Sequence, residues 1–471
     1  MVAFFPKVIS NKAIAAYIAS LALVSVVYMD YAMSFKFMLI GLLSVLGFFY
    51  FSNKLTVDWK SYSEKAFRKN VFWVSFAIRF AWVVFSYFFF MSQTGSPFEW
   101  DAADSISYHE LPAWMVQYNQ FDHIRESVKT NAADCGQYTY TYFIYKIVGY
   151  EGWFPIMFVR FLKAIWGAFT CVLIYNLAKK NFGDSTGRMA AIFCMLMPNL
   201  VMYAGFQLKE TEMVFLSVFY LDRADALLKE RKNIFLNIVA VALSASSLFF
   251  YRTVMGAVAV ISLCVSVIFS SSRKVKWYKK VMLVLLGVCF ALIVAGNSIL
   301  SQVESYWNGR GTNQTNRRLE QVNRGATWAK YATGAVMAPM IFVLPFSTMV
   351  DIDGQYLQQF LHGGNFVKNF MGIFVIFAFV YLVFINKKWR DHVLIGAYTV
   401  GYLLVVAMSA FANSERFLMP VIPMLLVFSA YGISLLNSRN FKYVKFWGYV
   451  VILMEFAWAF FKLGTRGLVG F

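Results

Sequence analysis

Long, uninterrupted apolar runs dominate this sequence, and they restrict the chain to folds that a membrane can hold. Of the 471 residues, 60% are hydrophobic and only 14% are charged. The apolar residues come in runs of about 17 to 22, not in the short alternation of a soluble core. A run of that length is enough for a helix to cross the hydrocarbon layer of a bilayer. The sequence therefore predicts an all-α polytopic membrane protein.

About thirteen membrane-spanning helices are predicted by this criterion. We expect them near residues 14–30, 33–52, 71–91, 155–177, 186–205, 211–227, 234–251, 253–271, 281–299, 366–385, 391–411, 417–436 and 446–463. Two longer polar segments, 92–152 and 300–365, separate them. The short apolar stretch at 336–346 contains two prolines and is expected to be re-entrant or interfacial.

Positive charge gathers in the short loops between the apolar runs. The net charge is +19, and basic loops such as AKKNFGDSTGR and SSRKVKWYKK all fall on one side of the membrane if the N-terminus is cytoplasmic. The charge is thus explained by orientation in the membrane, and no nucleic-acid partner is expected. Both long polar segments then become extracytoplasmic loops.

The first long segment opens with FEWDAADSISYHELPAW, an unusually acidic stretch for so apolar a chain. Helical spacing would put four polar residues on one face of a helix: Asp101, Asp104, Ser105 and Tyr108. Pro97 and Pro112 would bracket that helix. A carboxylate near apolar walls can act as a general base, whereas paired carboxylates could hold a divalent cation, Mg²⁺ or Mn²⁺. A solvated acidic loop helix is the alternative.

Four charged residues at other external turns extend this pattern. Lys209 and Glu210 could bind a lipid phosphate and position a substrate, or form an ordinary interfacial pair. Arg252 lies between two apolar runs with almost no loop, so it must face a cavity, a headgroup or a partner acid. Arg416 stands in a similar turn, although with Glu415 it could form a surface pair.

Arginines also occur in the second long segment, where the positive-inside rule does not favour them. Arg317 and Arg318 could bind phosphate or pyrophosphate oxygens, or anionic headgroups. In the first segment His109 adjoins Tyr108 and could hydrogen-bond a sugar.

Four motifs in this order resemble the GT-C superfamily of membrane glycosyltransferases, and most of all its bacterial protein O-mannosyltransferase and aminoarabinose-transferase branch. They are the Asp-x-x-x-Tyr-His pattern at 104–109, then ADCGQYTYTYFIYKIVGY, MPNLVMYAGFQLKE and ERFLMPVIPMLLVFSAYG. The resemblance covers about residues 70–437. It divides the chain into an N-terminal helical hairpin with a basic cytoplasmic loop (1–69), the catalytic transmembrane module (70–437) and a C-terminal helix (438–471).

The resemblance implies an inverting enzyme in a bacterial inner membrane, with its active site facing the periplasm. Its donor would be a polyprenyl-phosphate sugar, and its acceptor a hydroxyl of a lipid, a glycan or a protein. It implies Asp104 as the base, with Asp101 as a competitor and Glu99 completing the acidic motif. Lys209, Arg252 and Arg416 would hold the donor phosphate, and Glu210 would orient the sugar or the acceptor. No cofactor is certain, although Mg²⁺ or Mn²⁺ remains an option.

The sequence departs from this branch in two ways. The mannosyltransferases carry adjacent Asp and Glu where this chain has Asp101 and Asp104 three residues apart, and two helices precede the one that leads into the first external loop.

Two other functions remain open. An O-antigen polymerase or ligase with a lipid-pyrophosphate donor would use the external arginines. A transporter or flippase for lipid-linked saccharides would need ionisable residues along a path through the membrane. Arg79, Arg160 and Lys163 are the exceptions to a lining that is otherwise apolar.

Overall fold

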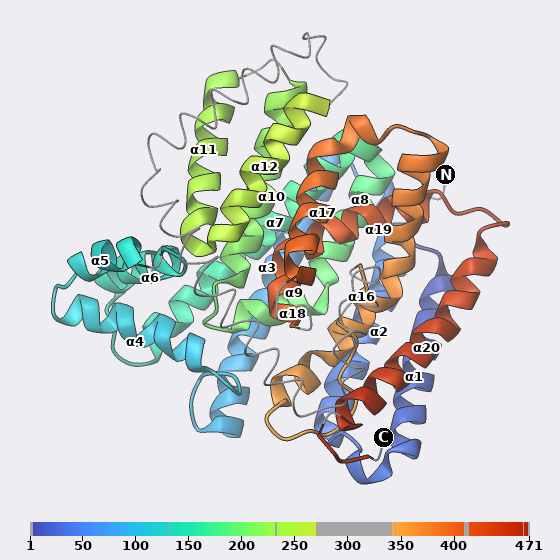
Figure 1. Cartoon of the computed structure of the whole chain (residues 1–471), viewed down its shortest axis with the longest axis horizontal. Helices are drawn as coiled ribbons and strands as arrows, with labels where there is room; N and C mark the ends of the chain where they lie inside the picture. Colours follow the sequence, from blue (N-terminus) through green and yellow to red (C-terminus); the bar gives the residue numbers. More distant parts are fainter. Residues whose placement is uncertain are drawn as a thin grey trace.

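The computed structural model describes residues 3–130, 132–230, 233–269, 342–343, 345–408, 414–464 and 466–469. Within these residues the protein is all-helical, as the apolar runs predict (Figure 1). Extended pairing is confined, in the described part, to one isolated antiparallel bridge between Ala32 and Val350.

The main helices follow one another through most of the described chain. They are α1 Lys7–Val27, α2 Phe35–Asp58, α3 Glu64–Thr94, α4 Ala103–Gln117, α5 Asp122–Thr130, α6 Cys135–Val148, α7 Trp153–Phe182, α8 Asp184–Leu196, α9 Pro198–Met202, α10 Glu210–Lys229, α11 Ile234–Tyr251, α12 Thr253–Phe269, α16 Tyr356–Val380, α17 Val393–Met408, α18 Glu415–Leu418, α19 Ile422–Ser434 and α20 Phe441–Gly464.

Eight of the described helices are long and apolar enough to cross a membrane, and a bent pair of helices makes a ninth. Thirteen spans are therefore not confirmed. The runs expected at 211–227, 253–271 and 391–411 are also helical over their described residues, but α10 carries several charges, and α12 and α17 have only 17 and 16 residues there. The span expected at 281–299 lies outside the described residues.

Helix α16 begins ten residues before the expected span, so the second polar segment ends earlier than residue 365. Its first turns contain the polar residues Gln359, His362 and Asn365, and all three are buried against protein. Because these polar side chains face protein and not lipid, the first turns of the helix do not appear as an apolar run in the sequence.

Three short helices, α4, α5 and α6, fill the first long segment between α3 and α7. Figure 1 shows them together at one edge of the molecule, beside the ends of α7 and α11. A small apolar cluster of their own, which includes Met115, Ile124 and Tyr142, holds them together. The acidic stretch is thus carried by a packed helical layer.

Helices α8 and α9 form the bent pair, with an angle of 54° between α8 and the segment from Pro198 to Gly205. Pro198 has no amide hydrogen, so it cannot close the helical hydrogen bond to the carbonyl of Cys194. Arg79 of α3, buried at 1% exposure, donates to this carbonyl from Nη2 at 3.1 Å and to that of Met195 from Nη1 at 3.3 Å. The break directs the chain into the turn at residues 203–209, which precedes α10.

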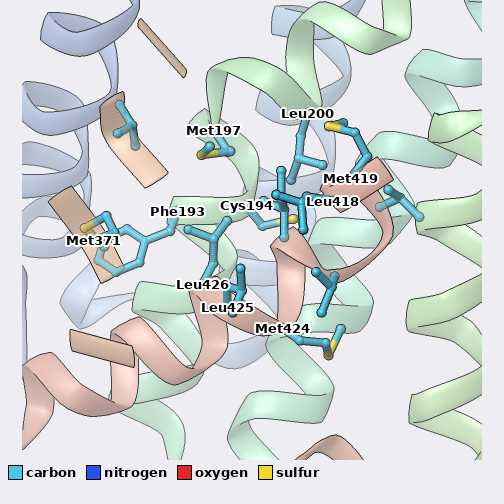
Figure 2. Close-up of a cluster of buried hydrophobic side chains, with 14 of the residues drawn as sticks. Phe193, Cys194, Met197, Leu200, Met371, Leu418, Met419, Met424, Leu425 and Leu426 are labelled. Atoms are coloured by element: carbon cyan, nitrogen blue, oxygen red, sulfur yellow. The ribbon is translucent and has the colours of Figure 1, made fainter. Parts of the chain in front are cut away.

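Apolar packing fixes the short helix α18 against this bent pair. Figure 2 shows Leu418 and Met419 beside Cys194 and Leu200, in a cluster of side chains that are at least 95% buried. The cluster holds the segment that contains Arg416 firmly against the core.

Basic loops lie together at the C-terminal ends of α7 and α10. Lys180 at the end of α7 pairs with Asp222 of α10 at 3.4 Å, and Lys229 donates to Asn181 at 2.6 Å. Arg188 donates to the carbonyl of Trp59 in the loop after α2 at 3.0 Å. Loops that we expect on the same side of the membrane therefore meet at one end of the protein.

Helices α1 and α20 pack against each other although they lie far apart in the sequence (Figure 1). Tyr28, just after α1, stacks on Phe456 of α20 with 5.5 Å between ring centroids.

Candidate active site

The acidic stretch forms the turn before α4 and the first part of that helix. Asp104 lies in the first turn of α4, and its side chain is 56% exposed. The expectation that Asp101 shares a helix face with Asp104 is wrong, because Asp101 has a left-handed φ of 58° and the helix begins only at Ala103. Pro112 does not end the helix either, since α4 continues through it to Gln117.

Arg416 joins Asp104 to a buried acid from another part of the chain. Its Nη1 contacts Oδ2 of Asp104, and its Nε donates to Oε1 of Glu210 at 2.6 Å. The Glu210 side chain is fully buried, whereas the side chain of Arg416 is 20% exposed. One guanidinium thus bridges a carboxylate at the surface and a carboxylate in the interior.

Arg252 reaches the same oxygen of Glu210. Its Nη2 lies 3.5 Å from Oε1, and its Nη1 donates to the hydroxyl of Tyr402 at 3.2 Å. The guanidinium also stacks 4.3 Å from the centroid of the Phe417 ring. The segment between α11 and α12 therefore places its arginine on a partner acid, one of the three environments expected for a cation between apolar helices.

A separate ion pair, between Lys209 and Asp134, lies beside the two arginines and Glu210. Lys209 contacts Asp134, the residue before α6, and donates to the carbonyl of Tyr251 at 2.7 Å. Tyr108 donates its hydroxyl to Oδ1 of Asp134 at 2.6 Å. Burial alone raises the pKa of the Asp134 carboxyl, but the charge and hydrogen bond of Lys209, the Tyr108 hydrogen bond and the Arg252 charge together hold that pKa below its ordinary value.

Three acids and three cations thus meet around one point and balance in charge. They come from five separate parts of the sequence: Asp104, Asp134, Lys209, Glu210, Arg252 and Arg416. We call this set the acid–cation cluster. Among its acids Asp104 is the most exposed, and Glu210 is the most buried.

Buried charges beneath the acid–cation cluster fix the loops that carry it. Lys163 of α7 contacts the carbonyl of Leu208, directly before Lys209, and lies 3.5 Å from Glu212. Its burial on the protein side of α7 gives this lysine a structural partner, so Lys163 does not face lipid.

Arg160 and Glu99 fix the turn that leads into α4. Arg160 donates from Nη2 to the carbonyl of Pro97 at 2.6 Å, and Ser105 donates to Oε1 of Glu99 at 2.5 Å. Burial raises the pKa of the Glu99 carboxyl, against the opposing effects of the Ser105 hydrogen bond and the Arg160 charge. Glu99 is only 4% exposed and lies under the turn that leads into α4.

His109 points to a different neighbour from that of Tyr108. Its Nδ1 lies 2.7 Å from the hydroxyl of Tyr145 on α6. Burial, and then the charge of Arg160, lower the pKa of the His109 imidazole below its ordinary 6.5, so the ring is neutral at pH 7.

The comparisons with known proteins are sparse. No protein-family model and no curated protein sequence matches the chain. Two solved structures of the oligosaccharyltransferase of the archaeon Archaeoglobus fulgidus are similar to it. One, a complex with zinc and sulfate, is 16% identical with a TM-score of 0.38 and covers 70% of this chain and 43% of its own. The other, a complex with an inhibitory peptide and a dolichol-phosphate, is 14% identical with a TM-score of 0.39 and covers 70% of this chain and 46% of its own.

This chain therefore spans less than half the length of either archaeal protein. Both TM-scores are too low to establish a common fold, so the acid–cation cluster is interpreted from its own residues.

The structure adds residues that sequence reasoning did not select. Asp134 precedes an aromatic-rich helix in ADCGQYTYTYF, and an acid directly before a helix was the available signal. Tyr402 lies in an apolar run, and nothing in that run distinguishes its hydroxyl from those of other tyrosines. Arg317 and Arg318 lie outside the described residues.

Proposed function

We propose that this protein is an inverting glycosyltransferase of the GT-C type, which moves a sugar from a polyprenyl-phosphate donor to an acceptor hydroxyl. The observation that carries the proposal is the bridge made by Arg416 between Asp104 and Glu210. It sets an exposed carboxylate next to two fixed guanidiniums, since Arg252 shares Glu210. The order of the four sequence motifs supports the same class of enzyme.

The acid–cation cluster supplies what such a transfer needs. Asp104 accepts the proton of the acceptor hydroxyl while the hydroxyl oxygen forms a bond to the anomeric carbon. The bond from that carbon to the phosphate oxygen breaks on the opposite face of the sugar, and its electron pair stays on the lipid phosphate. Arg252 and Arg416 stabilise the negative charge that grows on this phosphate. The sugar is therefore transferred with inversion.

The location of the acid–cation cluster agrees with a donor that is itself a membrane lipid. The cluster lies where α10 begins and α11 ends, and the basic loops meet at the other ends of α7 and α10. With the basic loops in the cytoplasm, the cluster faces the periplasm of a bacterial inner membrane. Residues 70–437 form the catalytic module in this proposal, and the acceptor is a lipid, a glycan or a protein.

A divalent cation does not fit the described residues in this arrangement. Asp104 is held by Arg416, while Asp101 lies on the left-handed turn outside the helix. Within the described ranges no group of three His, Cys, Asp or Glu side chains could hold a metal ion. No step of the proposed reaction therefore passes through Mg²⁺ or Mn²⁺.

The decisive experiment measures release of polyprenyl phosphate by the protein in lipid nanodiscs, with a panel of polyprenyl-phosphate sugars and candidate acceptors. We expect wild type to release polyprenyl phosphate from at least one donor. Asp104→Asn should lower the rate at least about 100-fold, because a carboxamide cannot accept the proton. Glu110→Gln, which neutralises an exposed acid on the same helix, serves as the matched control and should keep the wild-type rate.

Retained activity in both Asp104→Asn and Asp101→Asn would remove the proposed base. Loss of activity in Asp101→Asn alone would move the role of base to Asp101. If folded wild type releases nothing from any monophosphate donor but acts on a lipid-pyrophosphate oligosaccharide, the polymerase alternative replaces this proposal. Movement of an intact lipid-linked saccharide across the bilayer, without release of the lipid phosphate, would indicate a flippase.

A further inference from the structure

Arg416 has two carboxylate partners that differ sharply in environment. Asp104 is 56% exposed, whereas Glu210 is fully buried and shares its Oε1 with Arg252. An exposed ion pair gains little from its Coulomb attraction, because water and salt screen both charges. A buried acid shared by two guanidiniums is far harder to remove, since both cations would lose their partner. Of the two carboxylates, Asp104 is therefore the one that an incoming anion can displace more easily.

We propose that Asp104 and the phosphate of the donor compete for Arg416, so that donor binding releases the catalytic base. This inference rests on the function proposed above. Before the donor binds, Arg416 occupies a lone pair of the Asp104 carboxylate. The phosphodiester of the donor carries one negative charge, as the Asp104 carboxylate does, but its two non-bridging oxygens can engage Arg416 and Arg252 together. When the phosphate takes the Nη1 edge of Arg416, Asp104 becomes free to accept a proton.

Glu210 is the positioning residue of this exchange. Its Oε1 lies 2.6 Å from Nε of Arg416 and 3.5 Å from Nη2 of Arg252, and so holds together two cations that would otherwise repel each other. Arg252 is fixed further by Tyr402 and by the Phe417 ring. Both guanidiniums therefore keep their places when Asp104 leaves. The phosphate then meets a preformed pair of arginines.

The exchange orders the reaction. An acceptor hydroxyl that arrives first finds its base engaged by Arg416, so it is not activated without a donor. A donor that arrives first frees the base for the acceptor. The free base and the bound phosphate therefore exist only together.

The test measures the dissociation constant of polyprenyl phosphate, without sugar, for the protein in nanodiscs. If Asp104 competes with the phosphate, Asp104→Asn should bind polyprenyl phosphate about threefold to fivefold more tightly than wild type, as expected for removal of an exposed ion pair. Arg416→Gln should bind it at least about tenfold more weakly. Glu110→Gln, the control that removes a charge elsewhere on α4, should keep the wild-type affinity.

A double-variant cycle separates competition from simple loss of negative charge. In the Arg416→Gln background, Asp104→Asn should no longer tighten binding, because the two residues act through one contact. Equal tightening in both backgrounds would overturn the exchange, as would unchanged or weaker binding in Asp104→Asn. Asp104→Ser provides a second neutral variant in case Asp104→Asn does not fold.

The two proposals fail in different ways. If wild type transfers a sugar but Asp104→Asn binds polyprenyl phosphate as wild type does, the proposed competition at Arg416 is wrong and the proposed enzyme class still stands. If folded wild type neither transfers a sugar nor binds polyprenyl phosphate, both the exchange and the proposed enzyme class are wrong.

Glu210→Gln adds a kinetic readout. It should raise the KM for the donor more than it lowers kcat, because it loosens the arginine pair and leaves the base untouched.

Discussion

Pro198 and Arg79 act on the same atom, the carbonyl oxygen of Cys194. Pro198 withholds the amide hydrogen that a continuous helix would donate to it, and Nη2 of Arg79 donates in its place at 3.1 Å. An arginine in the middle of an apolar span is thereby explained as the partner of a helix break.

This relationship predicts how two substitutions combine. Arg79→Met should lower the free energy of unfolding by about 2 kcal/mol, because it leaves the carbonyls of Cys194 and Met195 buried without a charged donor. Pro198→Ala in the same background should recover part of that loss by restoring the helical amide. Thermal unfolding of the detergent-solubilised variants provides the measurement. Additive losses in the double variant would contradict the shared role.

The ion pair of Lys209 and Asp134 predicts a pH-dependent contribution to stability. Asp134→Asn should destabilise the protein by about 3 kcal/mol at pH 7, because Lys209 would stay buried without an acid. The pKa of Asp134 is lowered from its ordinary 3.8, so the pair stabilises the protein above pH 3.8, and its contribution is lost as the pH falls through the lower folded-state value.

Unfolding curves recorded between pH 3 and pH 7 check this sign. The gap between wild type and Asp134→Asn should stay constant from pH 7 to about pH 4 and then narrow. If the difference in free energy of unfolding widens as the pH falls, the pKa of Asp134 is not lowered in the folded protein. The double variant Asp134→Asn with Lys209→Met should be more stable than Asp134→Asn alone, since no unpaired charge remains.

Two helical glycines make a matched pair for a packing prediction. A Cβ on Gly432 of α19 would lie 1.9 Å from the backbone oxygen of Phe374, whereas a Cβ on Gly396 of α17 would meet no atom within 4 Å. Gly432→Ala should therefore cost at least about 2 kcal/mol by forcing α16 and α19 apart. Gly396→Ala should be neutral or gain up to about 1 kcal/mol from helix propensity. Similar melting temperatures for the two variants would be inconsistent with this packing.

Arg416→Lys should abolish most of the proposed transferase activity although it preserves the charge. In the proposed reaction Arg416 keeps Glu210 on Nε and takes the donor phosphate on Nη1, and a single ammonium cannot reproduce that fork. We expect a loss of about 100-fold or more in the rate of polyprenyl phosphate release. Lys146→Arg, a change at an exposed position of α6, is the control and should be neutral. Full activity in Arg416→Lys would show that charge alone suffices there.

Much of the helical architecture could be predicted because helices that face lipid have long apolar sequences. The run expected at 234–251 coincides with α11, and the run at 155–177 lies inside α7. The start of α16 could not be found in this way, since its first turns are polar and face protein. The bend at Pro198 could be suspected from the proline, but the donor to the carbonyl of Cys194, Arg79, lies in another helix.

The candidate site was partly predictable for a similar reason. Arg252 and Arg416 stand out because charge is costly beside apolar helices, and each has an acid partner in the structure. The pairing itself joins residues that are distant in the sequence, and no local pattern encodes it. Asp101 was placed on the wrong face because helical spacing was extended two residues beyond the helix, across a left-handed turn.

The contact between α1 and α20 separates the order of synthesis from the order of packing. The ribosome releases α1 long before α20, so Tyr28 has no Phe456 to stack on while the intervening helices enter the bilayer. Until then, the face of α1 that will cover α20 remains open to lipid or to an insertion factor. Helix α1 thus gains its contact with α20 only after the other described helices have been made, so an uncovered α20-facing side of α1 is a property of the unfinished chain.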